Sequence, residues 1–228
     1  MGDATRAKVT SFIQSADRRY GKVERPTTVP QPTSADAAAS AVVSAKNAQI
    51  VAGVVLGLHG PPAEGVEAAR KLMSHFVDWN EVRVSRPTTL VAALGRTPRA
   101  PERIALMHRF LEAYFLRQRS LNLDYLYTLK SHEVRRFLSD LEVFDREELA
   151  AVFLVGFDVP VFPPSDVLRD AAEHAGLLRG KTTSLQMAKK FETTLDEPML
   201  YVLYSHLCST ACDESSKGES KRRPAAKH

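Results

Sequence analysis

The residues of this chain that could do chemistry are few, and the densest group stands near its C-terminus. Cys208 and Cys212 are four apart on an expected helix and share a face, whereas His206 points to a different face. Thiolate and imidazole groups are common zinc ligands. The pattern is therefore that of a three-ligand metal site or, alternatively, of two ordinary cysteines on a terminal helix. With only two cysteines, this chain alone cannot form a disulfide framework, a four-thiolate zinc site or a four-cysteine iron–sulfur cluster.

Other sequence signatures of catalysis and of targeting are absent. The chain has no glycine-rich phosphate loop, no H-E-x-x-H and no G-x-S-x-G. No stretch approaches the ~20 apolar residues of a membrane span, and the N-terminus lacks the apolar core of a secretory signal. We therefore expect a cytoplasmic protein, associated with the nucleoid if its source is a bacterium.

Charge is distributed unevenly along the chain, whose net charge is +4. Residues 1–34 carry six basic and three acidic residues, and residues 213–228 carry five and three, so the basic excess lies at the two ends. Within the body, 96–136 holds nine basic and four acidic residues, whereas 137–175 holds two and nine. The basic segment is either a nucleic-acid-binding face or a partner for the acidic segment inside the fold.

The elements that must position these residues are expected to be helices almost throughout. Residues 1–34 and 213–228 lack periodic apolar positions and are predicted to be disordered basic tails or, alternatively, binding arms. Between them, apolar residues recur at helical spacing and no convincing period-two run occurs. The fold class is therefore all-α, with about ten helices and no sheet. Helices are expected over about 36–58, 62–76, 87–94, 100–119, 134–141, 149–156, 167–176, 183–192 and 197–211.

Several motifs occur in an order that is typical of one family of helical proteins. They are F-V-D-W-N-E-V-R at 76–83, P-E-R-I-A-L-M at 101–107, L-N-L-D-Y-L at 121–126, L-E-V-F-D-R-E-E-L-A-A-V-F-L at 141–154 and V-L-R-D-A-A-E-H-A-G-L-L at 167–178. In this order and spacing the chain resembles the endonuclease III-like helix-hairpin-helix DNA glycosylases. The resemblance implies a bilobal domain over 35–212, with a middle lobe at about 62–155 and a second lobe built from 36–60 and 160–211.

The resemblance also indicates where the chain departs from the family's catalytic pattern. The family hairpin reads L-P-G-V-G-x-K, and in that register Leu141 to Glu147 lack both glycines and place Glu147 at the catalytic lysine. A carboxylate cannot form a Schiff base, so that lyase chemistry is expected to be lost. The family's catalytic aspartate falls on Pro164 or Ser165. Asp166 is then either a catalytic candidate in a differently bent loop or a cap of the helix that follows.

The resemblance further implies DNA contacts from three basic or titratable side chains. His59 stands at the family's wedge position, where it either contacts DNA or ends a helix, while Arg146 and Arg169 lie in the hairpin and in the V-x-R helix. We expect DNA as the partner, no membrane, and no cofactor or iron–sulfur cluster. The expected function is base-excision DNA repair with degenerate or lost glycosylase/AP-lyase chemistry, so enzymatic activity is left open. The alternative is a non-catalytic helical module that binds nucleic acid or protein.

Overall fold

The arrangement of the helices follows from one segment that has no polar face. In the computed structural model, which describes residues 2–25, 37–58, 60–95, 97 and 99–222, every side chain from Ile50 to Leu58 is buried. This segment lies on α2 (Ala37–Gly57), which packs against α3 (Pro62–Met73), α6 (Ala100–Gln118) and α9 (Arg146–Gly156). A helix that is apolar all round must be covered on several sides, and these three neighbours provide that cover.

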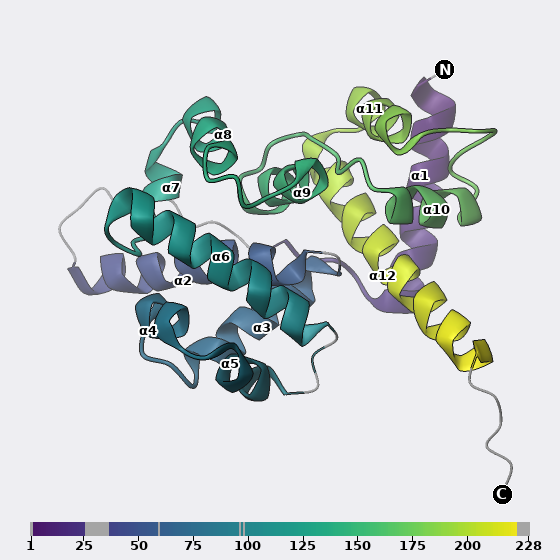
Figure 1. Ribbon diagram of the computed structural model, residues 1–228. Helices are drawn as coiled ribbons and strands as arrows, with labels where there is room; N and C mark the ends of the chain where they lie inside the picture. The colour runs from purple at the N-terminus through teal and green to yellow at the C-terminus, as the bar shows by residue number, and fades with distance from the viewer. Residues whose placement is uncertain (1, 26–36, 59, 96, 98, 223–228) are drawn as a thin grey trace, which may run out of the picture. The chain divides into compact units, whose positions relative to one another are not determined.

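Twelve helices and no strand occur among the described residues, which confirms the all-α fold class. The other helices are α1 (Gly2–Tyr20), α4 (Trp79–Val84), α5 (Pro87–Leu94), α7 (Tyr125–Thr128), α8 (Ser131–Ser139), α10 (Asp166–His174), α11 (Ser184–Thr194) and α12 (Glu197–Arg222). Figure 1 shows their course along the chain. Within the part of the chain that the structure describes, no helix combines the length and the apolar character needed to cross a membrane.

The chain divides into two compact units, each of which has its own core. The terminal unit consists of the described residues within 1–24, 59–61 and 160–228, and the central unit of those within 25–58 and 62–159. In the terminal unit α1 packs against α11 and α12, and α10 packs against the same two helices. In the central unit α5 packs on α3 and α6, and α4 packs on α6.

The D-W-N-E motif at 78–81 builds the start of α4 by hydrogen bonding. The Asp78 carboxylate accepts a hydrogen bond from the Glu81 backbone N–H at 2.7 Å, and the Glu81 carboxylate accepts one from the Val77 N–H at 2.6 Å. The first bond satisfies a donor that the helix start leaves open, and the second ties the residue before the cap to the first turn. Trp79 is buried beneath the turn, so the motif fixes both the beginning of α4 and its attachment to the core.

The predicted N-terminal tail is wrong for residues 2–20, which form α1. Val9 and Ala16 are buried, and they lie on one face because they are seven residues apart. Arg19 Nη2 pairs with Asp213 Oδ2 at 2.6 Å, which attaches α1 to α12. Because α1 is part of a core, deleting residues 1–34 would remove core contacts along with basic charge. The remainder of the predicted tail, 26–34, lies outside the described residues.

Two further predictions about domain organisation are also wrong. Residues 213–222 continue α12, so the predicted C-terminal tail is helical there, while 223–228 lie outside the described residues. The helix predicted at 36–58 was assigned to the same lobe as 160–211, but α2 belongs to the central unit. The physical reason is its apolar surface, which packs against α3, α6 and α9 of the central unit, whereas α1 supplies the N-terminal helix of the terminal unit.

Glycines set the distance between α2 and α3. Gly53 and Gly57 of α2 face Gly65 of α3, and a Cβ atom on Gly65 would overlap the Gly53 carbonyl oxygen and the Gly57 Cα. The overlapping atoms are backbone, so a side-chain rotation cannot relieve the clash. The two helices can therefore approach this closely only while residue 65 has no side chain.

We expect Gly65→Ala to lower the free energy of unfolding by about 1–3 kcal/mol, the usual cost of overpacking a core. On an exposed helix surface, a change from glycine to alanine instead raises the free energy of unfolding by about 1 kcal/mol. The sign of the measured change therefore distinguishes a packed glycine from an exposed one. Gly156→Ala on α9 is the matched control, because its Cβ would lie 3.5 Å from Val54 Cγ2, an ordinary contact. Thermal and urea denaturation measure both variants. Equal stability of Gly65→Ala and the parent would contradict the proposed close approach.

Candidate nucleic-acid interface

The turn between α8 and α9, residues 140–145, is closed by the protein's own backbone. The Glu142 N–H donates to the Ser139 carbonyl at 3.2 Å, and Glu142 has a φ of +53°. Glycine adopts this left-handed conformation without strain, whereas a residue with a side chain does so at a cost of about 1–2 kcal/mol. In the ungapped alignment the family's first glycine falls on Val143. The left-handed residue, Glu142, is one position before it. The turn therefore presents a carboxylate at its tip.

Carboxylates also occupy the start of α9. Asp145 Oδ1 accepts from the Glu148 N–H at 2.8 Å, and Glu148 Oε2 accepts from the Asp145 N–H at 2.9 Å, which is a complete capping box. Glu147 lies between these two residues and is half-buried. Three acidic side chains therefore surround the helix end where the backbone dipole would otherwise favour an anion. Arg146, the predicted DNA contact, is exposed at the first position of α9 and stands among these acids.

The predicted catalytic candidate Asp166 lies at the start of α10 in the terminal unit. Ser165, not Asp166, caps this helix, because its hydroxyl oxygen accepts from the Leu168 N–H at 3.4 Å. Asp166 is exposed, and its carboxylate pairs with Arg169 at 3.4 Å. Arg169 in turn binds Asp170 at 2.6 Å, and this hydrogen bond raises the pKa of the guanidinium. Asp166 and Arg169 thus meet on one helical turn, and each has a partner within that helix.

The other two predicted DNA contacts, Arg146 and His59, lie in other parts of the chain than Asp166 and Arg169. Arg146 belongs to the central unit, whereas Asp166 and Arg169 belong to the terminal unit. His59 lies outside the described residues, so its predicted wedge role stays a prediction.

The basic segment of the central unit is mostly unpaired. Arg117 pairs with Asp140 at 3.1 Å, and Arg103 pairs with Glu64 at 3.1 Å. Six other cations of this segment form no ion pair with any residue that the structure describes; they are Arg99, Arg109, Arg119, Lys130, Arg135 and Arg136. The sequence left two interpretations of this basic segment: a nucleic-acid-binding face, or a partner for the acidic segment 137–175. Among the described residues, Arg117 is the one cation of the basic segment that forms an ion pair with the acidic segment. All six of these other cations are exposed, and the Arg135 guanidinium lies over the Phe153 ring.

The His206, Cys208 and Cys212 group is divided by a contact between helices. The His206 side chain is fully buried, and its Nε2 lies 2.8 Å from Asp17 Oδ1 of α1. Cys208 is buried on the same helix and Cys212 is half-buried. Among the described residues, no three histidine, cysteine or acidic side chains are grouped so that they could hold a metal ion. His206 instead attaches α12 to α1.

One residue with unusual acid–base properties was missed by the sequence interpretation. Asp124, in the L-N-L-D-Y-L motif, is only 4% exposed, and burial raises its pKa to about 6. Burial likewise raises the pKa of Tyr114 and Tyr127, and Asp124 contributes to both shifts by charge repulsion. The available signal was a carboxylate in an otherwise apolar run, a pattern that places charge in a core.

Comparison of the fold with known structures identifies DNA-repair proteins. The chain aligns with a structure described as a trapped endonuclease III–DNA covalent intermediate, with a TM-score of 0.51, 11% sequence identity, and coverage of 89% of this chain and 84% of that one. A 3-methyladenine DNA glycosylase of H. pylori (MagIII), bound to 1,N6-ethenoadenine, aligns with a TM-score of 0.48 and 11% identity, covering 73% and 85%. No protein-family model matches the sequence, and no curated protein matches it either. The chain thus has the fold of endonuclease III.

Asp124 should make the stability of the protein depend on pH. Its pKa is about 6 in the folded chain against an ordinary 3.8, so between about pH 4 and 6 the folded state holds a proton that the unfolded state has released. The free energy of unfolding should therefore fall as the pH rises through this window. Asp124→Asn should abolish this dependence and stabilise the protein by about 3 kcal/mol at pH 7.

Urea denaturation from pH 4 to 8 measures the slope, and carbon-13 NMR of the Asp124 carboxyl measures its midpoint directly. An unaltered slope in Asp124→Asn, or a carboxyl midpoint near 4, would contradict the assignment.

Proposed function

We propose that this chain is a DNA-binding protein on a DNA-repair glycosylase scaffold that lacks the imine-forming lyase reaction. The observation that carries the proposal is the combination of the endonuclease III fold with an acidic α8–α9 turn. An imine requires a primary amine, and Glu147 stands where the family register has that amine. Asp145 and Glu148 meanwhile bond each other's backbone N–H groups.

The exposed cations of the central unit are the groups that we propose to contact DNA. Arg109, Arg119 and Arg136 have no carboxylate partner among the described residues, so their charge is available to phosphates. Phosphate contacts position a protein on DNA without reading its sequence. Binding is therefore proposed to be weakly sequence-dependent, to fall with rising salt, and to avoid the α8–α9 turn, where carboxylates repel phosphate.

Borohydride reduction tests the absence of lyase chemistry. An imine between a protein amine and an abasic sugar is reduced to a stable amine, which leaves a covalent protein–DNA complex. The full-length chain should give no such complex with a duplex that contains one abasic site. Glu147→Lys should give none either, because the capping box holds the turn without the family's glycines. A cross-linked band from the parent protein that survives denaturation would overturn the proposal.

Duplex binding tests the proposed contacts. Arg119→Ala combined with Arg136→Ala should weaken binding to plain duplex DNA and reduce the slope of log affinity against log salt by about 2, one per lost phosphate contact. Arg70→Ala is the matched control, because this exposed arginine is already paired with Glu67 on α3. Fluorescence anisotropy at ~50 and ~200 mM salt gives both quantities. Equal losses in the double variant and the control would reject this face as the contact.

A further inference from the structure

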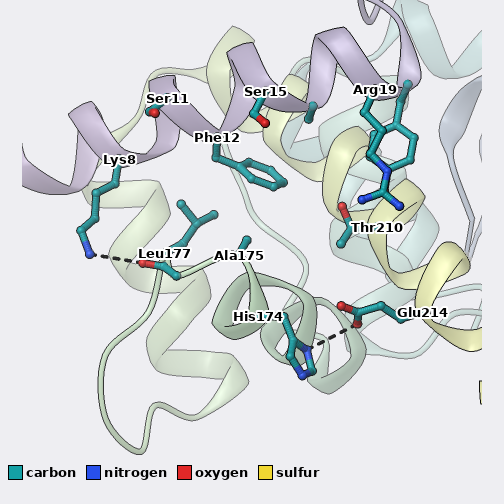
Figure 2. Close-up of a pocket in the computed structure, with 13 residues that line it drawn as sticks. Lys8, Ser11, Phe12, Ser15, Arg19, His174, Ala175, Leu177, Thr210 and Glu214 are labelled. Carbon is teal, nitrogen blue, oxygen red and sulfur yellow. Dashed lines mark hydrogen bonds and ion pairs between the residues drawn. The ribbon is translucent and has the colours of Figure 1, made fainter.

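The terminal unit contains a hollow whose walls belong to α1, the end of α10 and α12 (Figure 2). We call it the α1 trough. Its volume is about 550 Å³, within the range of sites that hold small molecules or single groups of larger ligands. Its lining includes none of the residues proposed above to contact DNA. It is therefore a separate feature that the proposed function does not use.

The floor of the α1 trough is apolar and carries one aromatic ring. Ala16 and Leu177 are buried beneath it. The Phe12 ring projects from α1 into the hollow and stays partly exposed (Figure 2). A flat ring on an apolar floor is a surface on which a nucleobase can stack, because every base presents an aromatic face.

One wall of the trough is a row of hydrogen-bond donors on α1. Lys8, Ser11, Ser15 and Arg19 follow one another at intervals of three, four and four residues, which places them along one face of the helix. Ser11 and Ser15 are exposed, and neither hydroxyl has a hydrogen-bond partner in the described part of the chain. The row thus presents a cation at each end and two available hydroxyls between them.

The two cations retain donors for a ligand. Lys8 Nζ donates to the Gly176 carbonyl at 3.2 Å, and an ammonium group has three N–H donors. Arg19 Nη2 donates to Asp213 at 2.6 Å, and a guanidinium has five. The acids nearby are themselves paired, since Asp213 also accepts from the Tyr20 hydroxyl at 3.1 Å and Glu214 lies 3.4 Å from His174. The negative side chains are therefore engaged at the α12 end of the trough.

The length of the donor row restricts the ligand. Lys8 and Arg19 are eleven residues apart on α1, which corresponds to about 16 Å along a helix. A single phosphate or carboxylate cannot reach both cations across that distance. The row instead complements a ligand with several anionic groups in line. Repeated anionic groups combined with flat rings are the defining chemistry of a nucleic-acid strand.

We propose that the α1 trough binds a segment of single-stranded nucleic acid, with phosphate oxygens along the donor row and a base against Phe12. The inference deepens the proposed function and rests on it for the class of ligand. It differs from that function in the site, which lies within the terminal unit, and in the strandedness of the ligand.

The test uses the full-length chain and a fluorescein-labelled oligothymidylate of about 12 nucleotides, a length typical of single-strand sites. Ser15→Glu places a carboxylate in the middle of the donor row and should weaken binding about tenfold or more, because it repels phosphate. Gln14→Glu is the matched control: it adds the same charge to the neighbouring exposed position of α1, outside the lining, and should change binding less than about twofold. Phe12→Leu keeps an apolar side chain but removes the ring and should weaken binding about tenfold.

A duplex of the same length and a polyglutamate competitor separate the possible outcomes. The inference is supported if Ser15→Glu and Phe12→Leu lose affinity for the single strand while Gln14→Glu keeps it and duplex affinity is unchanged in all three. It is overturned if the parent binds only duplex, if Ser15→Glu and Gln14→Glu behave alike, or if polyglutamate displaces the oligonucleotide as well as unlabelled oligothymidylate does. Binding to the single strand but not to duplex would instead reject the duplex contacts proposed for the central unit.

Discussion

The central unit depends on covering the apolar half of α2. Residues 50–58 have no polar face, so α3, α6 and α9 must all lie against this helix. The approach of α3 is possible only because glycines meet at the crossing. α9 is held against α2, and the Phe144 ring of the α8–α9 turn lies 5.7 Å from the Phe110 ring of α6, measured between ring centroids. Packing therefore fixes the position of the turn. The packing that holds this fold together thus does not depend on which polar residues occupy the α8–α9 turn.

The distribution of charge distinguishes this chain within that scaffold. At the α8–α9 turn, Glu142, Asp145, Glu147 and Glu148 create a negative helix end whose backbone donors are partly bonded by the protein itself. At the start of α10, Asp166 and Arg169 bond each other and their neighbours. Exposed cations without a carboxylate partner among the described residues, such as Arg109, Arg119 and Arg136, lie on other elements of the central unit. Unpaired cations attract phosphate. Any contact with nucleic acid is therefore expected away from the α8–α9 turn, which is where the family resemblance would place it.

Sequence periodicity predicted the long helices well because burial dictates it. The ranges expected at 36–58, 100–119 and 149–156 correspond to α2, α6 and α9 within about three residues, the usual uncertainty of such boundaries. The same reasoning did not predict α1. Its buried positions, such as Val9 and Ala16, are sparse among polar residues, and their role is evident only from the packing of α12 beside them. The sequence interpretation allowed Asp166 as the cap of α10, but the cap is its neighbour Ser165. The apolar neighbours of Asp124 in the sequence were a signal of its burial, whereas the size of its pKa shift depends on the packing of the folded chain.

The pairing of α1 with α12 joins two helices that are far apart in the order of synthesis. Arg19 and Asp213 are 194 positions apart, and a chain elongating at about 5–20 residues per second needs about 10–40 s to span that interval. The whole central segment between them emerges from the ribosome in the meantime. During this delay the apolar face of α1, which includes Val9 and Ala16, has no α12 to cover it. The terminal unit is thus completed only after the central segment has been synthesised, whereas the central helices can already assemble by then.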